Sequence, residues 1–591
     1  MADLNPSYDG TTFRVQSQRE IECVDKSMRL FSQLTTYRNQ GFAGQWEEVA
    51  SLIEPGSVNT FYYGNYNTPG MKKTQQQIDA TGMMANARFA AICDSLLTPS
   101  NMIYQRIALS DDALMKDRKV RLWCEVATNV LHAERYAPTA NFAAQNHANF
   151  RSLGAFGNLA MFIDELDDPE ITGLRYAGLP MGEIFFVTDH QNRVVGFVRW
   201  FKFTARQAHW KWPGQLPPNL HTAHTQQSEQ KYNFIHVVMP RDRDDYDPDR
   251  LDARGKRWQS TYICLEGHCL MFKEGADIEG GYRTFPLAAG RYAQAPDEVY
   301  GRGWAMDVLP SLKTLNAQKR IFLRAGHLAV DPIKLTRDDG VVGFKNRPGA
   351  MNPGGVDDQG RVLIHNMPVG DVQIGKEMMA EERGIINDNA LVTLFQILVK
   401  TPQMSATEVI ERANEKGILL APTMGRQQSE YISPMTMREL DILMYQRKLP
   451  PLPPIMREAG GKFHVIYDNP LSRLAKAQQG AGFLRTLESV HPIAQATGDT
   501  SIYDVFNLTV AIPGLAEQNA VPESWMADAK QVADKGKARA KAQQADMQMK
   551  NLPNQAAMVK AQAFAAKNNP QGQQGQPQPG QPQQQQPGQP Q

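Results

Sequence analysis

The chain has 591 residues, of which 42% are hydrophobic, and this amount of apolar material predicts two to four structural units. Its 63 basic and 62 acidic side chains leave a formal charge of only +1. A protein that grips duplex DNA by neutralising phosphates usually carries a basic excess, so this balance argues against a strong, uniform grip on nucleic acid. Two possibilities stay open: the chain contacts nucleic acid only weakly, or its basic and acidic faces are separated.

The cysteines and the longest apolar run argue against several other classes. Five cysteines, an odd number spread thinly along the chain, indicate a reducing compartment. Cys264, His268 and Cys269 form the only cluster of ligand residues, but a closed zinc site needs four ligands, so no metal site is predicted. No signal peptide is apparent, and the apolar run at 391–399 is far shorter than the roughly 20 residues of a membrane-spanning helix.

The N-terminal part of the chain is predicted to be helical. Its apolar residues recur at the three- and four-residue spacing that places them on one helical face, as in Phe89, Ile92, Cys93, Leu96 and Leu97. Helices are expected over residues 20–38, 89–97, 120–131 and 141–153. These faces are interpreted as core, without a cofactor site.

From Leu159 the period of the pattern changes to two, which is typical of strands. Strands are predicted at Leu159–Ile163, Glu183–Thr188, Val194–Phe203, Asn233–Met239 and Trp258–Glu266, with a hairpin loop at 189–193.

An acidic cluster around Asp164 raises the alternative of a hydrolase. Paired carboxylates can perform acid–base chemistry. Consecutive acids before Pro169 are more often a solvated turn, and the alternating charges at 241–250 are read as a charged loop because they lack the Gly and Glu of a calcium site.

Residues 304–328 are predicted to form a helix that packs against a neighbouring helix. Val308, Leu312, Leu315 and Phe322 keep a 3.5-residue spacing, interrupted at Lys319. Lys313, Arg320, Arg324 and His327 gather on another face. That face is either simply solvated, or directed toward DNA or toward a neighbouring subunit.

Residues 329–370 are predicted to be a small β module, because short strands at Val330–Leu335 and Arg361–Ile364 flank several glycines and prolines. A second helix, 371–388, carries charges of both signs, including Lys376 and Glu381. The apolar run after it cannot be assigned by periodicity, and a buried strand or helix is as compatible as a loop.

A further helix should begin at Ser405, because Ser405 and Glu408 have the spacing of a capping box. Pro422 and Pro434 predict that this helix is kinked or broken near both positions. A Pro-rich connector follows Leu449, and residues 462–467 are expected to form a strand that returns to the main body.

Several stretches of the sequence resemble the head-to-tail connector (portal) proteins of short-tailed (podovirus) bacteriophages. They are Ser95–Pro99 (SLLTP), Tyr300–Gly303 (YGRG), Gln403–Val409 (QMSATEV), Glu411-Arg412, Leu420–Arg426 (LAPTMGR) and Ser429-Glu430. With the order of the elements between them, the resemblance covers roughly residues 10–530. The middle stretches are fairly specific, whereas the flanking ones would be weak alone.

The resemblance implies a multi-domain α+β fold with a fixed division of the chain. The implied parts are a wing at 1–303, a stem helix at 304–328, a clip at 329–370, a second stem helix at 371–388, a tunnel loop at 389–404, a kinked wing helix with its return strand at 405–469, and a crown at 470–530. The crown is expected to be helical and broken by Gly498 and Pro513. Beyond it we expect an exposed Ala/Lys/Gln-rich helix at 531–570 and a disordered Gln/Pro/Gly tail at 571–591.

The resemblance also implies site residues and partners. The chain would form a ring, normally of twelve subunits, at one capsid vertex of the virion, assembled in the bacterial cytoplasm, with double-stranded DNA passing through its channel. Implied partners are the terminase large subunit, the major capsid and scaffolding proteins and the tail adaptor or tube proteins, with no membrane. Candidate residues are Gln396, Lys400 and Gln403 in the tunnel loop, Lys313, Arg320, Arg324, Lys376 and Glu381 in the stem, and Lys345 and Arg347 in the clip.

No catalytic motif accompanies this pattern. A phosphate loop needs a Gly-rich turn that ends in Gly-Lys-Ser/Thr, and the stretch from Gly64 to Thr74 has the wrong spacing. No Gly-x-Ser-x-Gly or His-Glu-x-x-His sequence occurs. We therefore expect no enzyme and no cofactor, and keep as the alternative function a structural hub or scaffold protein of the virion without a DNA channel.

Overall fold

The computed structural model describes residues 16–62, 70–115, 117–168, 170–272, 279–335, 345, 349–351, 355–367, 372–393, 425–458, 462–467, 482–492, 505–518, 521, 525–527, 531–545 and 558–561. The chain divides into two units, Met1–Val521 and Pro522–Gln591. In the second unit, residues 531–545 form a fully exposed helix within the expected 531–570 range. The tail at 571–591 lies outside the described residues.

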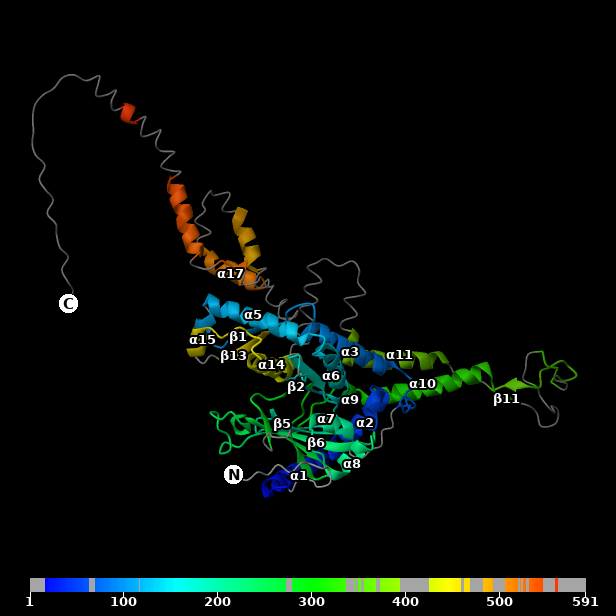
Figure 1. Ribbon diagram of the computed structural model, residues 1–591. Coiled ribbons are helices and arrows are strands. Elements are labelled where there is room, and N and C mark those ends of the chain that lie inside the picture. Colours follow the sequence, from blue (N-terminus) through cyan, green and yellow to red (C-terminus); the bar gives the residue numbers. More distant parts are fainter. Residues whose placement is uncertain are drawn as a thin grey trace, which may run out of the picture. The chain divides into compact units, whose positions relative to one another are not determined.

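The first unit begins with a series of helices (Figure 1), and the residues that they bury agree with the apolar spacing of the sequence. They are α1 (Gln18–Gly41), α2 (Ala43–Leu52), α3 (Thr81–Leu97), the short α4 (Asp112–Met115), α5 (Arg118–Arg135) and α6 (Phe142–Phe156), with a 3₁₀ turn η1 (Pro55–Ser57). A capping box of Ser17 and Glu20 starts α1, and the Asp117 side chain caps α5.

Antiparallel sheets follow in the chain. The largest has the order β4 (Ile184–Thr188), β5 (Val194–Thr204), β6 (Lys231–Pro240), β7 (Trp258–Cys264) and β8 (Cys269–Met271), with β9 (Gly280–Tyr282) paired to β7. A three-stranded sheet has the order β10 (Leu287–Arg291), β2 (Asn158–Glu165) and β3 (Leu174–Gly178). Two further pairs are β1 (Gln105–Leu109) with β13 (Phe463–Tyr467), and β11 (Lys334–Leu335) with β12 (His365–Asn366).

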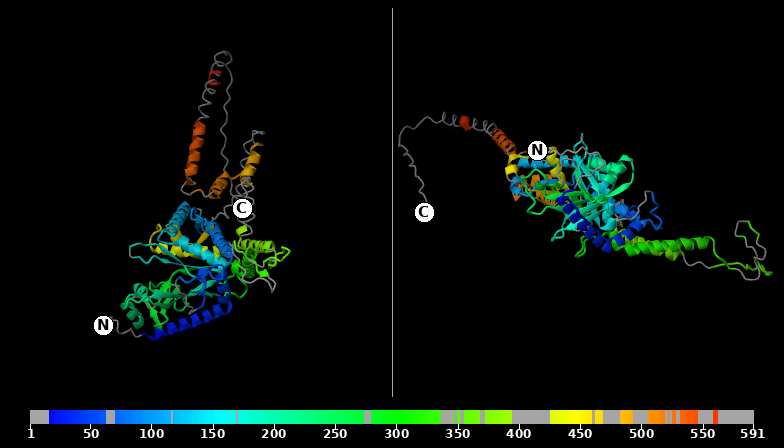
Figure 2. Two further views of the ribbon diagram at one scale, coloured as in Figure 1. Left: turned by 90° about the vertical axis from the view of Figure 1, so that its right-hand side faces the viewer. Right: turned by 60° about the horizontal axis from the view of Figure 1, so that its bottom comes forward.

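Both faces of the largest sheet are covered. Helix α1 packs on one face, where Val24 and Phe31 join Phe185 and Ile235 in a separate apolar cluster. On the other face, α7 (Ala205–Lys211) and α8 (Pro218–Thr225) bury Trp212 and Leu220 against Phe234. The main core lies among α2, α3, α5, α6, the three-stranded sheet and α14 (Ser433–Tyr445). Figure 2 shows the ribbon of the chain from two further sides.

Two antiparallel helices, α10 (Leu309–Val330) and α11 (Val372–Asn389), pack along each other and are called here the hairpin. Figure 1 shows them side by side, leading from α9 (Trp304–Asp307) and α3 toward β11. Val308, Leu312 and Leu315 are buried, as the spacing predicted, and Phe322 of the same set is partly buried.

The small β module differs from its prediction. The expected strand Val330–Leu335 is shortened to Lys334–Leu335, because α10 continues through Val330 and ends only where Pro332 disfavours a helical conformation of Asp331. The expected strand Arg361–Ile364 is wrong as well. The Asp357 side chain accepts hydrogen bonds from the backbone of Gln359 and Arg361, so this stretch begins in a turn, and the strand is His365–Asn366.

The prolines act differently from one another. Pro422 and Gly498 lie outside the described residues. At Pro434 the helix is not broken: a π-helical turn, η3 (Gln428–Ile432), leads directly into α14, and the Ser433 amide bonds back to the Gln428 carbonyl. The expected break at Pro513 is wrong, since α17 (Leu508–Gln518) runs through it. One proline removes a single backbone donor, which can bend a helix without ending it.

The hairpin starts from a close crossing of two backbone segments. The segment Tyr300–Gly303 passes over the C-terminal end of α6, and a Cβ on Gly303 would lie 2.5 Å from the Gly154 carbonyl oxygen. Gly157 has a left-handed backbone (φ 74°), and a Cβ there would come within 2.4 Å of the backbone of Arg302 and Gly303. The crossing therefore requires glycine on both segments.

Side chains lock this crossing on each side. The Asn158 amide donates to the Gly301 carbonyl at 3.1 Å and its oxygen accepts from the Gly301 amide at 2.7 Å. Tyr300 is buried edge-on against Trp46 at 5.2 Å between ring centroids, and Trp304 begins α9 fully buried. The direction in which the chain enters the hairpin is thus set by the core.

A buried ion pair joins α5 to α14. Arg135 Nε donates to Glu439 Oε1 at 2.9 Å, and its Nη2 contacts the second carboxylate oxygen, with both side chains fully buried. Hydrogen bonds from Arg135 to Tyr104 and Thr436, and from Tyr176 to Glu439, satisfy further polar atoms. A buried charge is tolerable only when it is paired and hydrogen-bonded in this way.

We predict that Arg135→Met destabilises the subunit by about 3–5 kcal/mol, because Glu439 would stay buried without its counter-charge. Denaturant unfolding of the purified chain measures this. The double variant Arg135→Met/Glu439→Leu should recover part of the loss. The exposed pair Arg206–Glu229 is the control, and Arg206→Met should change stability by less than about 1 kcal/mol. Equal effects of Arg135→Met and Arg206→Met would contradict this account.

We also predict that Gly303→Ala is destabilising by about 1–3 kcal/mol, because its Cβ meets backbone that has no room to retreat. Gly326→Ala is the matched control: in the described structure nothing lies within 4 Å of a Cβ at Gly326, inside α10. Alanine there should stabilise the helix by roughly 0.5–1 kcal/mol. Thermal melting of both variants gives the comparison, and a neutral Gly303→Ala would contradict the crossing as a constraint.

Candidate channel and docking surfaces

The base of the hairpin is tied to the N-terminal helices by polar contacts. Lys313 Nζ lies 2.6 Å from Glu48 Oε2 on α2. Asn316 Oδ1 accepts from the Ile78 amide at 2.8 Å, and Arg383 Nη2 lies 2.7 Å from Asp79 Oδ2. One predicted stem charge, Lys313, is therefore already paired within its own chain.

The electrostatics of Asp79 fit a structural role at this base. Partial burial opposes its ionisation, but hydrogen bonds from Thr81 and Arg383 outweigh that cost and lower the pKa of Asp79. The carboxylate thus stays charged and continues to hold Arg383, which sits in α11.

Beyond the base, the hairpin exposes both charge and apolar surface. Of the remaining predicted stem charges, Arg320, Arg324, Lys376 and Glu381 are exposed and form no ion pair with another described residue. The exposed large apolar side chains of the hairpin are Ile321, Leu323, Leu328, Val330, Ile374, Met378 and Ile385. Such a dense set on two adjacent helices is typical of a surface that is covered in an assembly.

The structure separates the predicted stem charges onto different faces. At about 100° per residue, Lys313, Arg320 and Arg324 fall on one face of α10, which we call the basic stripe. On α11, Glu377, Glu381 and Asp388 share a face, called the acidic stripe, and Lys376 lies on another. Glu377 and Asp388 were not identified from the sequence as part of an acidic stripe with Glu381. Their helical spacing from Glu381 could have indicated it.

The other predicted site residues are only partly described. Lys345 is exposed. Arg347 and the tunnel-loop candidates Gln396, Lys400 and Gln403 lie outside the described residues, as do Ser405 and Glu408. The α11 helix ends at Asn389, and residues 392–393 are again helical.

The stretch Ser429-Glu430 takes part in a structural clamp. Glu430, in the π-helical turn, holds Arg291 at the end of β10 through both carboxylate oxygens, at 3.1 Å from Nε and 3.0 Å from Nη2. Arg291 Nη2 also donates to the Asn192 carbonyl, in the loop between β4 and β5. The clamp thus joins the α14 segment to both sheets.

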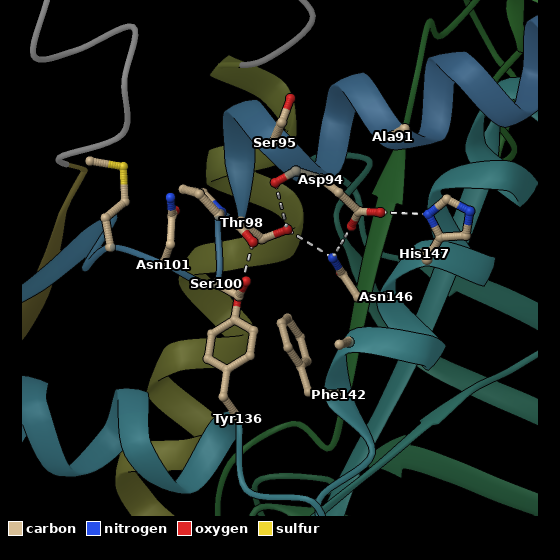
Figure 3. Close-up of a pocket in the computed structure, with 13 residues that line it drawn as sticks. Ala91, Asp94, Ser95, Thr98, Ser100, Asn101, Tyr136, Phe142, Asn146 and His147 are labelled. Carbon is tan, nitrogen blue, oxygen red and sulfur yellow. Dashed lines mark hydrogen bonds and ion pairs between the residues drawn. The ribbon is translucent and has the colours of Figure 1, made fainter.

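The SLLTP stretch lines an open pocket of about 540 Å³ between α3 and α6 (Figure 3). Asp94 Oδ2 lies 2.6 Å from His147 Nδ1, and Asn146 donates to Asp94 and to the Thr98 hydroxyl. Burial raises the pKa of Asp94, although His147 and Asn146 oppose this shift.

This pocket does not form a catalytic triad. Ser95 donates its hydroxyl to the Ile92 carbonyl at 2.9 Å, and Figure 3 shows it directed away from His147. The Tyr136 hydroxyl donates to the Thr98 carbonyl at 2.9 Å. Asp94, His147 and Asn146 mainly bind one another, which ties α3 to α6.

The acidic cluster considered for a hydrolase forms structural contacts. Asp164 Oδ1 accepts from the Glu165 amide at 3.0 Å and lies 3.5 Å from Arg438 Nη2. Asp168 Oδ1 accepts from the amides of Glu170 and Ile171 and so closes its own turn. These are the contacts of a strand end and a turn, and Arg438 Nη1 also lies 3.4 Å from Asp441 Oδ2 on α14.

Neither a metal centre nor a membrane span is found in the described part of the chain. No group of three His, Cys, Asp or Glu side chains there could hold a metal ion. Cys264 and Cys269 are opposite each other on β7 and β8 as free thiols, and the hydrogen bond with Cys269 lowers the pKa of Cys264. None of the described helices combines the length and the hydropathy needed to cross a bilayer.

Comparisons with known proteins agree with the resemblance seen in the motifs. The family model of the bacteriophage head to tail connecting protein matches residues 25–526. The probable portal protein of Bordetella phage BPP-1 is 25% identical over 88% of this chain and 91% of its own length. The portal protein of Salmonella phage epsilon15 is 24% identical over 93% of this chain and 96% of its own length.

One solved structure adds little. A chain from the virion of a native gene transfer agent particle is 10% identical and covers 69% of this chain and 85% of that one, but its TM-score is 0.30. The family match, in contrast, spans the helical N-terminal part, the sheets, the hairpin and α14. This chain belongs to the family of bacteriophage head-to-tail connecting proteins.

Proposed function

We propose that this chain is a phage portal subunit, which assembles into a closed ring of twelve copies at one capsid vertex of the virion. The family match over residues 25–526 carries this proposal, and the two relatives bear the name portal protein. The exposed hairpin supports it, because a single chain leaves its charged and apolar side chains uncovered.

The proposed mechanism is passive guidance of double-stranded DNA. A channel through which DNA must slide works with weak, evenly distributed contacts, and the formal charge of +1 is consistent with that requirement. Gln396, Lys400 and Gln403, in the segment after α11, are the proposed polar residues of a narrow tunnel loop. Lys376, exposed on α11, is the stem charge that lies apart from both charged stripes and is available to face the lumen.

The ends of the hairpin are proposed to exchange partners. The module around β11 and β12, with Lys345 and Arg347, would dock the terminase large subunit during packaging and tail adaptor or tube proteins afterwards. The broader body would contact the major capsid and scaffolding proteins during assembly in the bacterial cytoplasm. The energy for movement of DNA would come from the terminase partner, and the chain itself would have no catalytic role.

The alternative is a structural hub of the virion that conducts no DNA. Both functions need an oligomer or a multi-protein contact surface, but only a portal needs a closed ring. The proposal of a portal is preferred because both relatives bear the name portal protein. The match to each of them covers more than nine-tenths of the relative's own length.

We predict a single closed species at a fixed multiple of the 66.1 kDa chain, near twelve, when the purified protein is measured by native mass spectrometry. Cyclic assembly with head-to-tail contacts yields such a defined size because the rotation closes. Expression together with the capsid and scaffolding proteins is the second condition, since a ring can require a template. A monomer or dimer under both conditions would contradict the proposal.

A further inference from the structure

The two charged stripes lie on opposite outer sides of the hairpin. On α10, Lys313, Arg320 and Arg324 fall roughly 180° from the face of Leu315 and Phe322, which packs toward α11. On α11, Glu377, Glu381 and Asp388 point away from the buried face of Met379 and Ile386. The two stripes therefore cannot pair within one chain.

The positions of the charges on the two helices are complementary. From Lys313 the α10 face continues through Ala317, Arg320 and Arg324, with steps of four, three and four residues. Read backwards, the α11 face continues from Asp388 through Gly384, Glu381 and Glu377 with the same steps. Two antiparallel helices can thus place Lys313 opposite Asp388, Arg320 opposite Glu381 and Arg324 opposite Glu377 in a single register, over about 16 Å.

Small residues occupy the remaining position of that register. Ala317 stands opposite Gly384, and both are exposed. Among the described residues, nothing lies within 4 Å of the place that a Cβ on Gly384 would take, so its own chain gives no reason for glycine there. Glycine inside a helix costs about 1 kcal/mol relative to alanine, and close approach of a second helix is a common reason to keep it.

Apolar side chains border the same contact. Ile321 and Leu328 lie beside the basic stripe on α10, and Ile374, Met378 and Ile385 lie beside the acidic stripe on α11. When two antiparallel helices face each other through the two stripes, the apolar residues beside the basic stripe and those beside the acidic stripe lie on the same side of the contact. In the register above, Leu328 is level with Ile374 and Ile321 with Met378, to within about one turn.

We propose that the basic stripe on α10 of one copy packs against the acidic stripe on α11 of the next copy. The contact is antiparallel and consists of the three ion pairs, the Ala317–Gly384 approach and the apolar edge. It rests on the proposed ring, because opposite surfaces on one hairpin generate a head-to-tail, closing interface.

This contact has a consequence for the channel. Lys313, which also holds Glu48 of its own chain, and the two arginines Arg320 and Arg324 are then occupied between subunits and do not guide DNA. Glu377 keeps its hydrogen bond from Gln373 while accepting the second partner. The faces of the hairpin that carry neither stripe are then the ones available to line the channel.

Cysteine cross-linking tests the register directly. In Ala317→Cys/Gly384→Cys, oxidation of the assembled protein should give a ladder of covalent multimers on non-reducing gels, ending at the full ring. Ala317→Cys/Ala380→Cys is the matched control, because Ala380 is exposed but lies off the acidic stripe. The unmodified chain and the single variants correct for the native cysteines. A ring in which Ala317→Cys/Gly384→Cys gives no ladder, or only the same ladder as the control, overturns the contact while the portal proposal stands.

Charge reversal tests the ion pairs. Arg320→Glu places like charges opposite each other and should raise the subunit concentration needed for half assembly by roughly tenfold or more. Arg320→Glu/Glu381→Arg should restore assembly, whereas Lys376→Glu, on another face, should leave it unchanged. Failure of the double variant to recover, with its fold intact by circular dichroism, overturns the proposed pairing. Absence of any ring from the unmodified chain, both alone and with the capsid and scaffolding proteins, would instead refute the portal proposal on which the contact rests.

Discussion

The close crossing of Tyr300–Gly303 over the C-terminal end of α6 is the constraint on which the rest of the molecule's functional surface depends. It fixes where the hairpin starts, because the Asn158 side chain forms two hydrogen bonds with the Gly301 backbone. Trp304 is buried in the core immediately after this segment. Arg383 and Asp79 then fix α11 near its end. Two helices held this firmly at one end can present charged and apolar stripes at defined positions, which a flexible arm could not.

Much of the fold could be predicted from the sequence, and the misses have physical causes. Apolar spacing located α3, α5, α6 and α10, and alternation located β2 and β4 to β7. β10 was missed because Leu-Ala-Ala-Gly-Arg has little strand character of its own and pairs only because β2 lies beside it. The Arg135–Glu439 pair joins residues 304 positions apart, so no local pattern could indicate it.

The candidate site was predictable only in part. The spacing of Lys313, Arg320 and Arg324 identified a basic face, but not that Lys313 also pairs with Glu48 on a helix distant in the sequence. The YGRG and Ser429-Glu430 stretches were interpreted as family motifs. In the structure YGRG forms the close backbone crossing, and Glu430 binds Arg291 in the clamp. The basic and acidic stripes of the hairpin lie on opposite outer sides, so a chain with a formal charge of only +1 still carries locally separated charge there.

The most direct test of the proposed channel is an electron cryomicroscopy map of the assembled protein. We expect a closed ring with an axial opening wide enough for duplex DNA. The α10–α11 hairpins should stand around that opening, each with α10 against α11 of its neighbour. A compact particle without an opening, or hairpins that point away from the axis, would contradict the channel and favour the structural hub.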